Sequence, residues 1–279
     1  MSSRLRAIAR ETVEALERGA YRTAGGTEVV IADQVAKAVA GTRLHLPDDP
    51  LPAPPTPTPH RPTAPTVEVT NETTLAATRR LGGDLACLVF ASARNPGGGF
   101  RNGAQAQEES VARGSGLYAC LQAAWDFYAA HRADPDLGYS DRVIYSPAVP
   151  VFRDDDGEPL AAPYPVSFLT SAAPNRSAML RSQPDRVADV PALLRRRIDR
   201  VLAVAAAYGH RRLVLGAWGC GVFGNEPTVV AEAFGGALRD GPRFDQVVFA
   251  VFDRQRGTPT YAAFARALGH RPDPVGGPF

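Results

Sequence analysis

Three runs of apolar residues constrain the fold of this chain most strongly. They are DLACLVFAS (84–92), RLVLGAW (212–218) and QVVFAVFD (246–253), and each is followed, after a loop, by a segment with helical spacing. Runs without regular polar interruption are typical of strands that are buried on both faces of a sheet. The alternation of such runs with helical segments therefore predicts an α/β fold with helices on both faces of the sheet.

The remaining segments set the expected organisation around this sheet. Residues 4–20 have the pattern of an amphipathic helix, and a single long helix is expected from about 107 to 131. Prolines crowd residues 46–66, which excludes a helix and favours an extended surface crossover, with a ligand for a proline-binding module as the alternative. We expect an N-terminal helical extension over 1–45, this crossover over 46–66 and the main unit over 67–270, in one compact domain.

Composition excludes several classes of protein. The chain has 279 residues, of which 44% are hydrophobic and 22% charged, as in a folded domain. A formal net charge of +2 gives no electrostatic basis for wrapping nucleic acid, so no sequence-specific nucleic-acid contact is expected. No stretch reaches the roughly eighteen apolar residues of a membrane span, and the first residues lack the apolar core of a signal peptide. We therefore expect a cytoplasmic protein without membrane contact.

The three cysteines, Cys87, Cys120 and Cys220, do not form a framework. They are odd in number and widely spaced, which excludes a set of disulfides and matches no zinc motif. Each lies in or beside an apolar run, so small buried or pocket-lining residues are expected. Neither a metal ion nor an organic cofactor is indicated.

Two glycine-rich loops follow strand-like runs and precede helices. Ligands of open α/β sheets bind at this place, and glycine allows backbone amides to approach a phosphate. The second loop, GCGVFG (219–224), matches the dinucleotide-binding pattern G-x-G-x-x-G, so a nicotinamide-dependent oxidoreductase is one alternative. That match is weak, because the loop lies late in the chain and the next helix begins only after its last glycine.

The first glycine loop carries more information. It contains three consecutive glycines, 97–99, and is followed by Gln107, Glu108 and Glu109 at the start of a helix. Acidic residues in a first helical turn are common, since they complement the helix dipole. The triple glycine beside them points instead to a ligand site with two carboxylates.

This pattern resembles the signature of poly(ADP-ribose) glycohydrolases. The form NPGGGF (95–100) is similar to the bacterial-type members, which have a macrodomain fold. VTNETT (69–74) is similar to the turn that holds adenine in macrodomains, and GAWGCGVFGN (216–225) resembles their second phosphate loop. FAVFD (249–253) ends the last strand where an aromatic residue often stacks on adenine. The resemblance implies a three-layer α/β/α macrodomain-like fold with a mixed central sheet, an N-terminal helical extension and a catalytic core over 67–270.

A pocket for ADP-ribose is also implied by the resemblance. Both glycine loops would grip the diphosphate and the distal ribose, with Asn95 bonded to that ribose and Phe223 closing over it. The implied substrate-binding residues are Asn95, Gly97, Gly98, Gly99, Gln107, Gly219, Gly221, Val222, Phe223 and Gly224, with Glu72, Thr73 and Phe252 at the adenine end.

Two adjacent glutamates need different roles in such chemistry. Neighbouring helical residues project about 100° apart, so Glu108 and Glu109 cannot flank one glycosidic bond from opposite sides. By resemblance, Glu109 is the general acid/base that protonates the leaving ribose hydroxyl, and Glu108 orients a ribose hydroxyl. The expected activity is hydrolysis of ribose–ribose bonds in poly(ADP-ribose), at chain ends, with ADP-ribose as product.

Other functions remain open on the sequence. A non-catalytic ADP-ribose-binding macrodomain would keep the pocket without needing Glu109, and a hydrolase that removes single ADP-ribose units would use the same groups. The expected partners are poly(ADP-ribose) or an ADP-ribosylated protein, and the expected state is a monomer.

Overall fold

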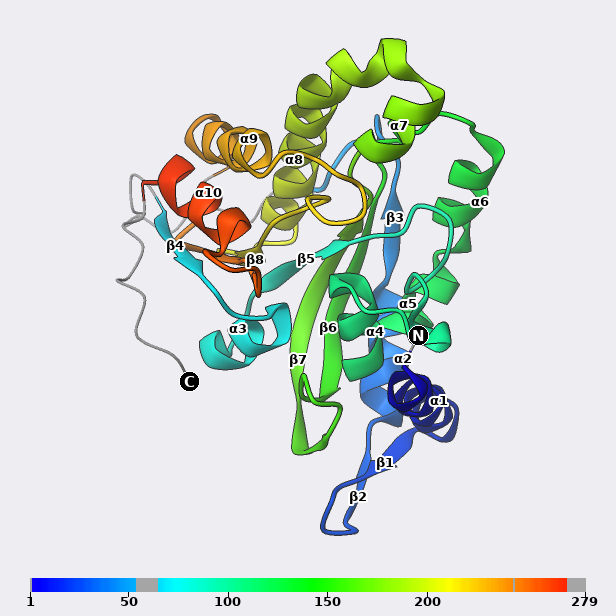
Figure 1. The fold of residues 1–279 in the computed structure, drawn as a ribbon. Helices are drawn as coiled ribbons and strands as arrows, with labels where there is room; N and C mark the ends of the chain where they lie inside the picture. Colours follow the sequence, from blue (N-terminus) through cyan, green and yellow to red (C-terminus); the bar gives the residue numbers. More distant parts are fainter. Residues whose placement is uncertain (1, 54–64, 243, 270–279) are drawn as a thin grey trace.

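Seven strands form one mixed sheet in the computed structural model (Figure 1). Five neighbouring strands, from β7 to β4, run parallel, whereas the pairs β3–β6 and β6–β7 are antiparallel. The order across the sheet is β3 (Arg43–His45), β6 (Val143–Arg153), β7 (Pro159–Ser171), β5 (Ala86–Phe90), β8 (Arg212–Leu215), β9 (Gln246–Ala250) and β4 (Thr66–Thr70).

The structure describes residues 2–53, 65–242 and 244–269. The middle of the proline-rich segment, 54–64, therefore lies outside the described residues, and the predicted extended crossover stays a prediction. Within the described ranges, no helix combines the length and the apolar character needed to cross a membrane.

Apolar side chains from the central strands alternate between two cores. In β5, Ala86 and Leu88 belong to one buried cluster, and Cys87 and Val89 belong to the other. This two-sided burial is the reason the strand has an uninterrupted apolar sequence.

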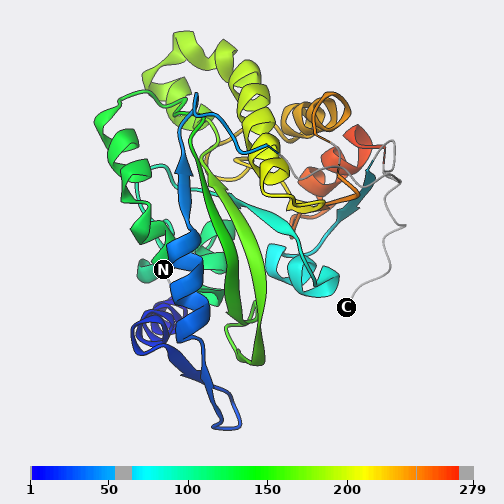
Figure 2. The ribbon, with the colours of Figure 1, turned by 180° about the vertical axis from the view of Figure 1, so that it is seen from behind.

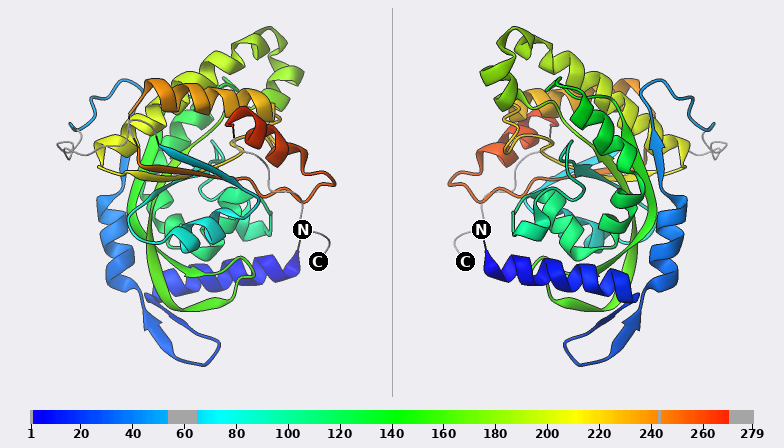
Figure 3. Two further views of the ribbon diagram at one scale, coloured as in Figure 1. Left: turned by 90° about the vertical axis from the view of Figure 1, so that its left-hand side faces the viewer. Right: turned by 90° about the vertical axis from the view of Figure 1, so that its right-hand side faces the viewer.

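Helices cover both faces of the sheet, so the predicted three-layer fold with a mixed central sheet is confirmed (Figure 3). One face carries α8 (Val190–Ala207), α9 (Pro227–Asp240) and α10 (Pro259–Ala267). The other carries α2 (Ala32–Gly41), α3 (Thr74–Leu81), α4 (Gln107–Gly114), α5 (Leu117–Ala123) and α6 (Trp125–Ala133). The remaining elements are α1 (Ser3–Arg18), α7 (Arg176–Ser182), the 3₁₀ turns η1 (Phe100–Asn102) and η2 (Pro184–Asp189), and a hairpin of β1 (Ala20–Arg22) and β2 (Glu28–Val30).

The expected single helix over 107–131 is wrong, because the chain divides there into α4, α5 and α6. The first break is at Ser115, whose hydroxyl donates to the Val111 carbonyl (2.7 Å) and accepts from the Leu117 amide (3.2 Å). Gly116 turns its amide away from the helix to the Pro150 carbonyl (2.9 Å). A strand of the sheet thus takes the hydrogen bond that would have continued the helix.

The N-terminal segment is built into this sheet and into the loop after β5. Strand β3 pairs with β6, and Figure 2 shows it at the edge of the sheet, following α2. Helix α1 packs Ala9 against Phe100 and Ala112, and the Thr12 hydroxyl donates to the Arg113 carbonyl (2.7 Å). The division at residue 45 stays a prediction, but α1 clearly supports the segment that carries Glu108 and Glu109.

Candidate active site

A cavity of about 830 Å³ lies at the carboxyl ends of the parallel strands. Its walls come from the segments that follow β5, β8 and β9 and from the first residues of α3 and α4. Parallel α/β sheets bind ligands at this edge, because the loops there are free to differ while the strands stay fixed.

Glu108 is a buried residue of the cavity lining. Its side chain is only 2% exposed, and its Oε2 atom accepts a hydrogen bond from the Ser92 amide (2.6 Å). Oε1 is also buried and has no hydrogen-bond partner among the described residues. Burial raises the pKa of Glu108 well above its usual value, and the neighbouring Glu109 charge adds to this effect, while the Ser92 and Gly97 amides oppose it. The unpartnered oxygen needs a hydrogen-bond donor, which a ligand hydroxyl would supply.

Glu109 is partly exposed to the cavity. Its Oε1 atom accepts from the Gly99 amide (3.0 Å), and in the described part of the chain Oε2 makes no hydrogen bond. One turn further along α4, the buried Arg113 guanidinium donates to the Ala104 carbonyl (2.6 Å). The Glu109 charge raises the pKa of Arg113, although burial lowers it more. One carboxylate oxygen of Glu109 is thus held by the backbone and the other is available to a reacting group.

The triple glycine wraps around the two carboxylates. Gly98 has a φ of +58°, and a Cβ atom there would lie 3.0 Å from Oε2 of Glu108 and still closer to Oε1 of Glu109. A residue with a side chain would therefore both strain the backbone and displace the carboxylates. This loop positions the acids as well as offering amides to a ligand.

Both polar atoms of the Gln107 side chain form hydrogen bonds within the protein. Its Oε1 atom accepts from the Phe90 amide (2.9 Å), and its Nε2 atom donates to the Leu88 carbonyl (2.8 Å). These bonds tie the first turn of α4 to the end of β5. They also place the next two residues, while the predicted substrate contact of Gln107 stays a prediction.

The second glycine loop, 219–224, forms the opposite wall. Gly219 has a φ of +72°, and a Cβ atom there would lie 2.7 Å from the Ala173 side chain. The backbone carbonyl of Phe223 accepts from the Ser177 amide (2.9 Å). The Phe223 ring packs against the core, and its centre lies 6.0 Å from the centre of the Tyr139 ring. The loop is therefore held from below, with Val222 85% exposed at its tip.

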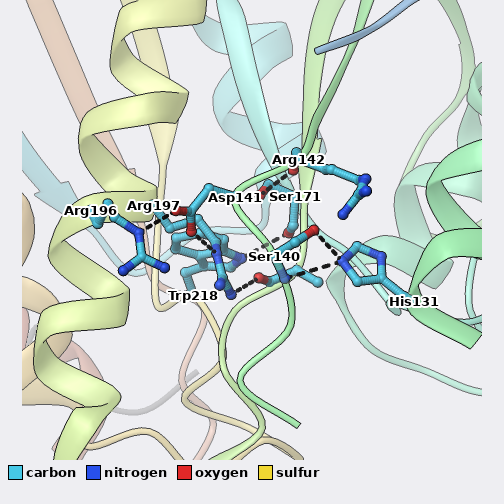
Figure 4. A network of polar contacts seen from close by, with 9 residues as sticks. His131, Ser140, Asp141, Arg142, Ser171, Arg196, Arg197 and Trp218 are labelled. Atoms are coloured by element: carbon cyan, nitrogen blue, oxygen red, sulfur yellow. Dashed lines mark hydrogen bonds and ion pairs between the residues drawn. The ribbon is translucent and has the colours of Figure 1, made fainter. Parts of the chain in front are cut away.

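A buried polar network supports this wall (Figure 4). Arg197 is fully buried, pairs with Asp141 (3.0 Å) and donates to the Ala172 carbonyl (2.6 Å). The Trp218 indole donates to the Ser171 carbonyl (3.1 Å). Since Trp218 also lines the cavity, the network joins the end of β7 to the second glycine loop.

The comparisons with known proteins identify the family. The family model of the microbial-type PARG catalytic domain matches residues 9–154. A poly(ADP-ribose) glycohydrolase of Thermomonospora curvata, solved with the inhibitor ADP-HPD, is 54% identical, with 95% of this chain and 99% of that chain covered and a TM-score of 0.85. This chain belongs to the microbial-type poly(ADP-ribose) glycohydrolases.

Further solved glycohydrolases agree with this membership. A second structure of the T. curvata glycohydrolase is 53% identical over 95% of this chain and all of that chain, with a TM-score of 0.86. The glycohydrolase of Deinococcus radiodurans in complex with ADP-ribose is 45% identical, covers 84% of this chain and 96% of that chain, and has a TM-score of 0.76. No curated protein matches. The predicted family and the macrodomain-like fold are confirmed.

Most of the predicted site residues of this glycohydrolase meet at the cavity. Its lining includes Thr73, Gln107, Glu108, Glu109, Gly219, Gly221, Val222, Phe223 and Phe252. Gly97, Gly98 and Gly99 lie directly behind the two carboxylates, and Gly224 lies at the exit of the second loop. Their roles in substrate binding remain predictions.

The side chains of Asn95 and Glu72 lie outside the cavity lining, where arginines bind them. Asn95 is exposed, and its Oδ1 atom accepts from the Arg132 guanidinium (3.1 Å), which itself stacks on Trp125. Glu72 turns away to pair with Arg80 (2.7 Å). Sequence adjacency to a loop or turn does not reveal which way such side chains point.

Several lining residues were not among the predicted ones. Ser92 supplies the amide that fixes Glu108, and Arg254 lies 4.7 Å from the centre of the Phe252 ring. Asp155, in the turn between β6 and β7, also lines the cavity and accepts from the Thr73 hydroxyl (2.6 Å). The run Asp-Asp-Asp-Gly signals a turn but not where its tip lies.

Proposed function

We propose that this chain hydrolyses the ribose–ribose O-glycosidic bonds of poly(ADP-ribose) and releases ADP-ribose from chain ends. The observation that carries the proposal is the pair of glutamates held by one glycine loop inside a cavity whose opposite wall is a second glycine loop. Backbone amides and helix N-termini at such loops favour a diphosphate.

The geometry suits a division of labour between the two acids. Glu108 is fixed and buried, with one oxygen left for a ribose hydroxyl. Glu109 has its free oxygen toward the cavity. In the proposed reaction, Glu109 gives its proton to the leaving ribose oxygen as the C1–O bond breaks. It then takes a proton from the water that adds to the oxocarbenium-like carbon, so that two hydroxyl groups result and the acid is restored.

Glu109→Gln tests this assignment directly. The change keeps the size of the side chain but removes its ionisable proton, so release of ADP-ribose from labelled poly(ADP-ribose) should fall by about 10²–10⁴-fold. Calorimetric binding of ADP-ribose should persist, because the loops remain. Glu232→Gln, an exposed acid on α9, is the matched control for the loss of one charge.

The outcome also decides between the functions. Glu108→Gln should impair catalysis through misplacement of the sugar, and retention of full activity by both variants would place the active site elsewhere. A wild-type chain that binds ADP-ribose without releasing it from the polymer would be a reader instead. A cytoplasmic location and a monomeric state stay predictions.

A further inference from the structure

Two loops that are hydrogen-bonded to each other form the end of the cavity that contains Phe252. We call it the base end, because a nucleobase would stack there. Phe252 lines the cavity with half of its surface exposed, which suits stacking against a nucleobase. The adjacent Asp253 amide donates to Asn71 Oδ1 (2.8 Å), and Asn71 Nδ2 donates to the Asp253 carbonyl (3.2 Å). The turn after β4, which ends at Thr73, therefore lies beside the aromatic ring.

Asp155 joins this end from a different part of the chain. Its Oδ2 atom accepts from the Thr73 hydroxyl (2.6 Å), and Oδ1 has no hydrogen-bond partner within the described ranges. Thr73 cannot turn elsewhere, because its hydroxyl oxygen also accepts from the Ala76 amide and caps α3. The free oxygen of Asp155 is thus held at the cavity wall next to the base end.

The hairpin that carries Asp155 is itself braced. Asp154 accepts from the Asp156 and Glu158 amides (3.0 and 2.8 Å), which closes the turn. Helix α1 holds the turn from outside, since Arg4 donates to the Asp156 carbonyl and Ile8 packs closely against Gly157. The placement of Asp155 is therefore a property of the fold rather than of a free loop.

The other carboxylates in or near the cavity are hydrogen-bonded elsewhere or are assigned to the sugar. Asp253 accepts from the Gln255 and Thr260 amides (2.9 and 2.7 Å). Glu108 and Glu109 lie in the first turn of α4, where the first glycine loop holds them. Glu72, the acid expected at the adenine end, lies outside the lining and is paired with Arg80. Asp155 is the lining carboxylate that remains to accept a hydrogen bond from a base.

We propose that Asp155 is a specificity-determining residue, which accepts a hydrogen bond from the exocyclic amine of adenine and disfavours a 6-oxo purine. The inference rests on the proposed function, because it takes ADP-ribose as the occupant of the cavity. A carboxylate attracts an amine donor and repels the lone pairs of a carbonyl oxygen. The free oxygen of Asp155 therefore both favours adenine and disfavours a 6-oxo purine.

Calorimetric titration with ADP-ribose and with inosine diphosphate ribose tests the proposal. Wild type should bind ADP-ribose at least about tenfold more tightly, as expected for one hydrogen bond to a charged group. In Asp155→Asn the preference should vanish or reverse, because the amide N–H can donate to the 6-oxo group. Asp156→Asn, at a neighbouring residue that does not line the cavity, should keep the wild-type ratio, and Asp155→Ala should bind both ligands without preference.

Each contrary result overturns a definite statement. Equal binding of the two ligands by wild type, or an equal loss for both ligands in Asp155→Asn, would show that Asp155 does not select the base. An equal loss would place it on a ribose hydroxyl instead. If wild type binds inosine diphosphate ribose and ADP-ribose equally, the proposed function survives; if it binds neither, the proposed function fails and this inference fails with it.

Discussion

Replacing Gly98 by alanine should separate the position of the Glu108 and Glu109 carboxylates from the stability of the fold. The new Cβ atom would lie within 3.0 Å of the Glu108 carboxylate and closer still to that of Glu109, whereas ordinary contacts begin at 3.4 Å. Glu109 must therefore move by about 1 Å, a displacement that commonly costs about 10²-fold in rate. Because a flexible carboxylate can give way, the effect on folding should be small beyond the strain of the positive φ, about 1–2 kcal/mol.

Gly26→Ala is the matched control for that strain. Gly26 has a φ of +81° in the β1–β2 turn, and a Cβ atom there would meet nothing within 4 Å. Chemical denaturation should show similar losses of unfolding free energy in both variants, while only Gly98→Ala loses about 100-fold in the initial rate of ADP-ribose release. A Gly98→Ala enzyme as active as Gly26→Ala would refute the view that the glycine loop sets the position of the acids.

Three further results are expected. Burial and the charges of Arg142 and Arg197 lower the pKa of His131 from 6.5 to about 4, so this histidine is neutral in the folded protein, and the unfolded chain binds more protons between these values. The free energy of unfolding should therefore fall as pH drops from 6.5 toward 4, by on the order of 3 kcal/mol from this group. Chemical denaturation of His131→Asn should show a free energy of unfolding that depends less on pH. An unchanged pH dependence in this variant would show that His131 is not the group responsible. Phe223→Ala should reduce kcat/KM by at least about tenfold with only a modest fall in Tm, since the ring is partly buried; a large fall in Tm with normal turnover per folded molecule would make it a core residue. ADP-ribose affinity should be unchanged by a chelator, because the grip is expected from backbone amides, and a collapse in affinity would show a metal-dependent site.

Periodicity and apolar runs were sufficient to predict the layered sheet, because each central strand must bury both faces. They could not predict β3, since three residues, Arg43–His45, carry too little pattern and are held by pairing with β6. The division after α4 was also missed. Ser115 and Gly116 were visible as weak helix formers, but the partner that draws the Gly116 amide away is a carbonyl of a distant strand.

The candidate site was predictable where local chain geometry defines it. The triple glycine and the two following acids are local, and they meet at the cavity as expected. Glu72 and Asn95 lie outside the lining because distant arginines, Arg80 and Arg132, bind them, and their expected substrate contacts stay predictions. Asp155 was overlooked for the converse reason, as a turn tip becomes part of a cavity only through the long hairpin β6–β7 and the helix that braces it.

The pairing of β4 with β9 has a consequence for folding. β4 is an edge strand, and its partner β9 lies far along the chain, with Thr66 opposite Gln246. During synthesis, the base end of the cavity cannot assemble until β9 has emerged, and β4 meanwhile lacks the strand that pairs with it. Contacts of such large sequence separation slow folding and leave a strand edge open to association with other chains. The enzyme should accordingly fold slowly, with aggregation competing until β9 is in place.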